Sequence, residues 1–174
     1  MIPSDKTFNG NEFYEHDGKR YYRWYNLKID KPYIVNFKLI SSNSVNKQGI
    51  VLFFSDFQGE LYVNNHKVKI LKGFKHYLFK TQDLETNDLE LQVYPNKGHL
   101  FFGNASEDPK GIGYECGAFG CAFWIEAIDY YTYRFHCNDH EYDDDFDDLV
   151  FDVTITKYTD AKEWLSLAKS IENK

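Results

Sequence analysis

Residues 149–156 read LVFDVTIT, and this stretch decides the fold class. Every second residue in it is strongly apolar: Leu149, Phe151, Val153 and Ile155. A period of two places alternate side chains on opposite faces of an extended chain. We therefore expect a β-strand whose apolar face lies in a core.

A second run, residues 117–137, is almost continuously apolar and aromatic and reads GAFGCAFWIEAIDYYTYRFHC. Aromatic side chains favour strands, and 18% of the whole chain is aromatic, which is high for a globular protein. The run predicts two core strands joined by a tight bend near Asp129.

Turn signals separate the remaining aromatic and β-branched runs at about ten-residue spacing, which is typical of an all-β sandwich or barrel. Asp17-Gly18 predicts a two-residue hairpin, since glycine tolerates positive φ. Asn64-Asn65 predicts another, and Pro95–Gly98 a further turn. Between the last two, Leu89, Leu91 and Val93 alternate with polar residues, as in a half-exposed strand.

The C-terminal residues carry a helical pattern instead. Apolar side chains recur at helical spacing at Ala161, Trp164, Leu165, Ala168 and Ile171. Asp160 and Glu163 are placed like a capping box. We predict one domain over residues 1–174, an antiparallel β-sandwich or jelly roll closed by a helix at about 160–172.

No stretch approaches the ~20 apolar residues that a membrane span needs, and the first ten residues lack the pattern of a signal peptide. The chain has three cysteines, an odd number, which cannot all pair with one another. Both observations favour a soluble protein in the reducing cytoplasm. A secreted protein whose leader had been trimmed would look the same.

The net charge of −7 is concentrated in one segment. Residues 139–152 hold eight acidic residues and no Lys or Arg: Asp139, Glu141, Asp143, Asp144, Asp145, Asp147, Asp148 and Asp152. The rest of the chain is close to neutral. Because no comparable basic cluster exists, nucleic-acid binding is disfavoured.

Closely spaced carboxylates suit calcium, which takes about six to eight oxygen ligands. Asp143, Asp145, Asp147 and Asp148 are the candidate ligands. The segment is not an EF-hand, because that loop would require Gly where Asp148 stands and Glu where Thr154 stands.

Residues 143–150, DDDFDDLV, resemble the D-x-D-[FY]-[ND]-D-[LV]-V segment of calcium-binding β-sandwich domains in bacterial extracellular proteins. The resemblance covers these eight residues. It implies calcium ligation by Asp143, Asp145, Asp147 or Asp148 just before a final strand.

Two other interpretations of the acidic loop stay open. The carboxylates could steer a basic protein partner, or they could simply be solvated and screened beyond a Debye length of about 8 Å. In each case we expect Phe146 to anchor the loop by burial.

The cysteines offer an alternative metal site. Cys116, Cys121, Cys137 and His140 have the C-x4-C-x15-C-x2-H spacing, and three thiolates with one imidazole can hold zinc. Cys121 stands in an apolar run, however, where a cysteine is usually a small buried hydrophobe. The core interpretation is therefore favoured over zinc.

Catalysis has weaker support. Glu126 and Asp129 are the only acids in the aromatic run, and three residues apart on a strand they point to opposite faces. No local signature marks a nucleophile. Trp24 and Tyr22 are candidates for stacking on a carbohydrate ring.

The function predicted first is a non-catalytic binding module whose acidic loop 139–152 binds calcium or a basic partner. The alternative is a small cytoplasmic interaction or inhibitor protein, similar to an immunity protein. A sandwich-fold hydrolase comes third, so enzymatic activity is not the expectation.

Overall fold

The computed structural model describes residues 13–69, 77–86, 88–107, 110, 113–116, 121–139 and 145–157. These residues are mainly β, and every pair of neighbouring strands is antiparallel, which confirms the predicted class. The one helix among them is α2 (Thr81–Thr86). All twelve strands belong to a single sheet.

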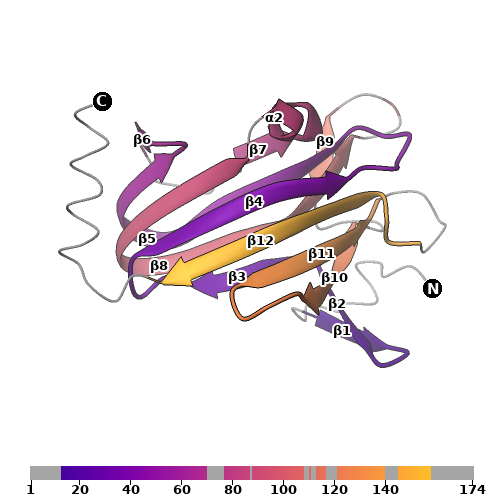
Figure 1. Cartoon of the computed structure of the whole chain (residues 1–174), viewed down its shortest axis with the longest axis horizontal. Helices are drawn as coiled ribbons and strands as arrows, with labels where there is room; N and C mark the ends of the chain where they lie inside the picture. Colours follow the sequence, from indigo (N-terminus) through magenta and orange to yellow (C-terminus); the bar gives the residue numbers. More distant parts are fainter. Residues whose placement is uncertain are drawn as a thin grey trace.

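The strands, in chain order, are β1 (Phe13–His16), β2 (Lys19–Tyr22), β3 (Tyr25–Lys28), β4 (Tyr33–Ser41), β5 (Gln48–Val63), β6 (His66–Val68), β7 (Tyr77–Lys80), β8 (Leu89–Glu107), β9 (Tyr114–Cys116), β10 (Ala122–Ala127), β11 (Thr132–Asn138) and β12 (Leu149–Lys157). In the sheet they follow the order β1-β2-β10-β11-β12-β4-β8-β5-β6. β3 and β9 also pair with β8, and β7 pairs with β5. Figure 1 shows β4, β12 and β11 side by side, with β5 and β8 extending beyond β4.

Two predicted hairpin turns are confirmed. Asp17 and Gly18 have φ angles of 49° and 75°, and Asn64 and Asn65 have 47° and 68°. Two consecutive positive φ angles match the right-handed twist of the strands that they join, and Gly and Asn tolerate them best. The first turn joins β1 to β2, and the second joins β5 to β6.

The predicted turn at Pro95–Gly98 is wrong, because β8 continues through it from Leu89 to Glu107. The pairing of β5 with β8 continues past these residues. It changes register twice, between Ser55 and Gly59 of β5. Such bulges bend a strand pair and increase its twist without ending it. The first part of β8 pairs with β4 and the later part with β3, so the sheet curls into a half-barrel.

The face inside the curl forms the core, and its largest fully buried side chains are phenylalanines: Phe37, Phe102, Phe123, Phe135 and Phe151. Phe135 and Phe151, from β11 and β12, stack with ring centroids 5.0 Å apart. The strand predicted from LVFDVTIT is confirmed as β12, and its Leu149, Phe151 and Val153 are 0% exposed. Burying aromatic surface supplies most of the stabilisation that such a core provides.

Two finer architectural predictions, the sandwich or jelly roll and the C-terminal helix, stay predictions. A single curled sheet does not establish the two layers of a sandwich or jelly roll, so that architecture stays a prediction. The predicted helix at 160–172 lies outside the described residues. Within the part of the chain that the structure describes, no helix is long and apolar enough to cross a membrane.

Gly98 tests the bend in the long ladder. Its φ is +135°, and a Cβ there would lie 2.7 Å from the Cα of Phe57 on β5. We expect Gly98→Ala to lower the free energy of unfolding by more than about 1 kcal/mol in urea titrations, because both the backbone angle and the contact resist a side chain. Gly113→Ala, which meets nothing within 4 Å, is the matched control. Equal effects of the two changes would contradict this account of the bend.

Candidate functional site

Asp139, the first residue after β11, is a fully buried carboxylate. Its Oδ2 accepts hydrogen bonds from the hydroxyl of Ser44, from Asn46 Nδ2 at 3.3 Å and from Gln48 Nε2 at 2.9 Å. Burying a charge is costly unless donors surround it, and hydrogen bonds to a charged acceptor are the strong ones. Asp139 thereby fastens the end of β11 to the connection between β4 and β5.

Asp148, just before β12, is the second buried carboxylate and is 4% exposed. Its Oδ2 accepts the backbone N–H of Asp139 at 2.8 Å. Its carbonyl oxygen accepts the backbone N–H of Asn43 at 3.1 Å and the hydroxyl of Ser42 at 3.2 Å. The two ends of the acidic loop are therefore bonded to each other and to the same β4–β5 connection.

Phe146 lies between Asp139 and Asp148 in the sequence. Its side chain is buried, as expected from the sequence, and is 7% exposed. It packs beside Ala122 and lies with its ring centroid 5.0 Å from that of Tyr21. Its φ is +57°, a conformation that is strained for a bulky residue. The burial of the ring stabilises this strained conformation and holds the loop against the outer face of β2 and β10.

Asp145 and Asp147 flank Phe146 and are both exposed. The backbone N–H of Asp147 donates to Asp145 Oδ1 at 3.1 Å, and Asp147 Oδ2 accepts from Asn43 Nδ2 at 3.2 Å. These bonds connect the Asp145 carboxylate to the backbone of Asp147 and the Asp147 carboxylate to Asn43. Asp143 lies outside the described residues.

Asn138 is a functional candidate that the sequence reasoning missed. It is 0% exposed, and neither its side-chain oxygen nor its side-chain nitrogen has a hydrogen-bond partner. Its cross-strand neighbour is Ala122, so Asn138 lies on the face of the sheet where Phe146 packs. A buried amide with no partner is rare in folded proteins and costs free energy.

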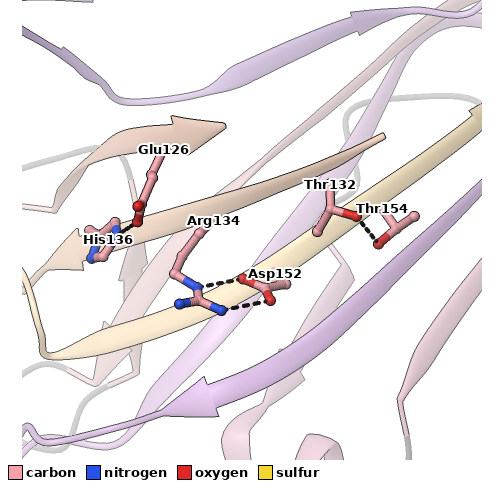
Figure 2. Close-up of polar contacts among 6 residues, drawn as sticks. All are labelled: Glu126, Thr132, Arg134, His136, Asp152 and Thr154. Carbon is pink, nitrogen blue, oxygen red and sulfur yellow. Dashed lines mark hydrogen bonds and ion pairs between the residues drawn. The ribbon is translucent and has the colours of Figure 1, made fainter. Parts of the chain in front are cut away.

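Asp152 belongs to a different environment, the outer face of β10, β11 and β12 (Figure 2). Arg134 donates to both of its oxygens, at 2.8 and 3.1 Å. This hydrogen-bonded pair raises the pKa of Arg134 above its ordinary value. The charge of Asp152 is therefore matched by a cation from the neighbouring strand and adds little to the acidity of the loop.

The two acids that were considered for catalysis, Glu126 and Asp129, both have hydrogen-bond partners. Glu126 Oε2 lies 3.0 Å from Nε2 of His136 (Figure 2), whose ring stacks on Trp124 at 3.9 Å between centroids. Asp129 lies in the turn between β10 and β11, where its Oδ1 accepts the N–H groups of Tyr131 and Thr132, each at 2.7 Å. These hydrogen bonds lower the pKa of Asp129. Each acid thus has a structural partner of its own.

The zinc alternative receives no support from the thiols that are described. Cys121 and Cys137 are buried, and burial raises the pKa of Cys137 well above its ordinary value. Both observations are typical of cysteines that act as small buried hydrophobes, the interpretation favoured from the sequence. The Cys116 side chain and His140 lie outside the described residues. Among the residues that are described, no three His, Cys, Asp or Glu side chains are grouped to hold a metal ion.

The two aromatic residues considered for sugar binding pack on different neighbours. Tyr22 packs against the core and stacks on Phe123 at 5.9 Å between centroids. Trp24 lies edge-on to Phe53 at 4.9 Å. Carbohydrate binding by these residues stays a prediction.

Comparisons with protein-family models, with curated proteins and with solved structures find no match for this chain. The functional argument therefore depends on the geometry of the loop and its anchors.

The buried anchor is testable by an isosteric change. Asp139→Asn removes the negative charge from the group that accepts three hydrogen bonds. Because bonds to a charged acceptor are the strong ones, we expect the free energy of unfolding to fall by about 2 kcal/mol or more. Asp145→Asn is the matched control at an exposed position, with an expected change within about 0.5 kcal/mol. Urea unfolding of both variants measures the difference. Losses of equal size would show that Asp139 is not an anchor.

Proposed function

We propose that this chain is a non-catalytic binding domain whose acidic loop holds a calcium ion. Asn138 carries the proposal, because its buried amide oxygen lacks a donor on the face of the sheet where Phe146 of the acidic loop packs. A cation at this position would satisfy that oxygen and offset the repulsion between the neighbouring acids.

The available ligands have the chemistry that calcium prefers. The carboxylates of Asp145, Asp147 and Asp148 and the amide oxygen of Asn138 are all hard oxygen donors, and calcium takes about six to eight of them, water included. Among the described residues these carboxylates are not grouped around one point, so calcium would have to draw their side chains together. The sequence resemblance adds Asp143 to this set. Calcium would supply charge neutralisation and a rigid link between the loop and the end of β11.

The loop is also held in place before any ion arrives. Asp139 and Asp148 fix its two ends, and Phe146 fixes its middle. The anchored residues, 139 and 145–148, then lose little conformational freedom on binding, which favours affinity. The curled antiparallel sheet is the scaffold of this site.

A basic protein partner is the second candidate, and the exposure of Asp145 and Asp147 favours it. Two exposed carboxylates two residues apart would attract a cationic surface and accelerate its association. In that case the chain is a small interaction or inhibitor protein, and calcium is not required.

A thermal melt in calcium chloride, magnesium chloride or chelator tests the first candidate. A ligand that binds only the native state contributes about 2.7 kcal/mol at a concentration of 100 times its Kd, which corresponds to a rise of about 5 °C or more for a chain of this length. We expect this rise with calcium and its loss in Asp145→Asn/Asp147→Asn. Asp17→Asn, at a side chain that is 84% exposed, should keep the response.

An unchanged melting temperature with calcium would refute the calcium proposal. Binding to polylysine that weakens as salt rises, without calcium dependence, would then favour the basic partner.

A further inference from the structure

A second group of buried polar atoms lies at the end of the β5–β8 ladder. Gln48, Asn104 and Ser106 are 0%, 1% and 0% exposed. Gln48 Oε1, Asn104 Oδ1 and Ser106 Oγ have no hydrogen-bond partner among the residues that the structure describes. We call these three atoms the inner oxygen cluster.

The strand pairing brings the three side chains to one face of the sheet. Gln48 and Ser106 are direct cross-strand partners, and Asn104 is two residues from Ser106 on β8. The same face carries Ile50 and Phe102 of the core. Asn138 is on the opposite face, with Ala122, so the inner oxygen cluster is distinct from the proposed calcium site, although Gln48 bonds the loop anchor Asp139.

The hydrogen bonds of the two amides fix which of their atoms remain available. Gln48 Nε2 donates to Asp139 Oδ2 at 2.9 Å and to the carbonyl of Asn46 at 3.2 Å. Asn104 Nδ2 donates to the carbonyl of Asn138 at 2.8 Å. Turning either amide over would set oxygen against oxygen. The two unpaired amide oxygens are therefore acceptors, and their partner must be a donor or a cation, whereas the Ser106 hydroxyl can accept or donate.

We propose that the inner oxygen cluster binds a monovalent cation, sodium or potassium. Carbonyl oxygens can replace the hydration shell of such an ion, as they do in potassium-selective filters. Gln48 bonds the carboxylate of Asp139, whose charge is already shared by three hydrogen-bond donors. Calcium affinity rises with the number of charged ligands, so a set of neutral oxygens suits a singly charged ion better.

The ion would connect three segments that are distant in the sequence. Gln48 begins β5, Asn104 and Ser106 end β8, and Asn104 and Gln48 both donate to the end of β11. Gln48 also contacts Asp139, so occupancy of the inner oxygen cluster would stabilise the anchor of the acidic loop. Binding here does not require the calcium proposal to hold.

Melts in sodium chloride, potassium chloride and choline chloride test this site, all with chelator and at one ionic strength. We expect a melting temperature several degrees higher in one alkali chloride than in choline chloride. Since chelator is present throughout, calcium binding at the loop does not affect the result. Equal melting temperatures in the three salts would overturn the proposal.

Ser106→Ala distinguishes an ion from an unfilled polar pocket by the sign of its effect. Ser106 makes no hydrogen bond that the change would break, so the variant should fold. If an ion binds, the variant loses the alkali-specific shift. If none binds, removing a buried unpaired hydroxyl raises the melting temperature equally in every salt, which would overturn the proposal. Ser55→Ala, at the bulge of β5, is the control that keeps the shift.

Rubidium scatters anomalously and substitutes for potassium, so crystals grown in rubidium chloride locate the ion directly. An anomalous peak within coordination distance of Gln48 Oε1 and Asn104 Oδ1 would support the proposal. Ordered water alone at the inner oxygen cluster would overturn it.

Discussion

The arrangement of the acidic loop depends on the burial of one carboxylate, that of Asp139 at the end of β11. An ionised carboxylate taken out of water costs several kcal/mol unless donors replace its hydration. The connection between β4 and β5 supplies those donors from Ser44, Asn46 and Gln48. This requirement joins two segments about ninety residues apart in the chain, and it fixes where the acidic loop begins.

The same requirement divides acids that look alike in the sequence. Asp139 and Asp148 are buried and structural, Asp152 is paired with Arg134, and Asp145 and Asp147 remain at the surface. Concentrated negative charge is therefore only part of the reason for considering a ligand. The stronger reason is that Asn138, on the face where Phe146 of this loop packs, has an amide that the described hydrogen bonds do not satisfy.

The sequence predicts the features that depend on local physics. The alternation in LVFDVTIT and the Asp17-Gly18 turn need only neighbouring residues, and both are confirmed. Pro95–Gly98 has an equally local turn signal, but the long pairing of β5 with β8 overrides it. The burial of Gln48, Asn104 and Asn138 follows from how the sheet curls, which is a non-local property. As polar residues within strands, they cannot be told from surface positions by sequence alone.

Hydrogen exchange of the Asp139 backbone N–H, followed by NMR in chelator, tests the central claim most directly. This N–H donates to the buried Asp148 carboxylate, so the account predicts exchange as slow as that of the β11–β12 ladder, without any added ion. Exchange as fast as in an unfolded segment would contradict the account. It would mean that the buried anchors do not order the loop without a ligand.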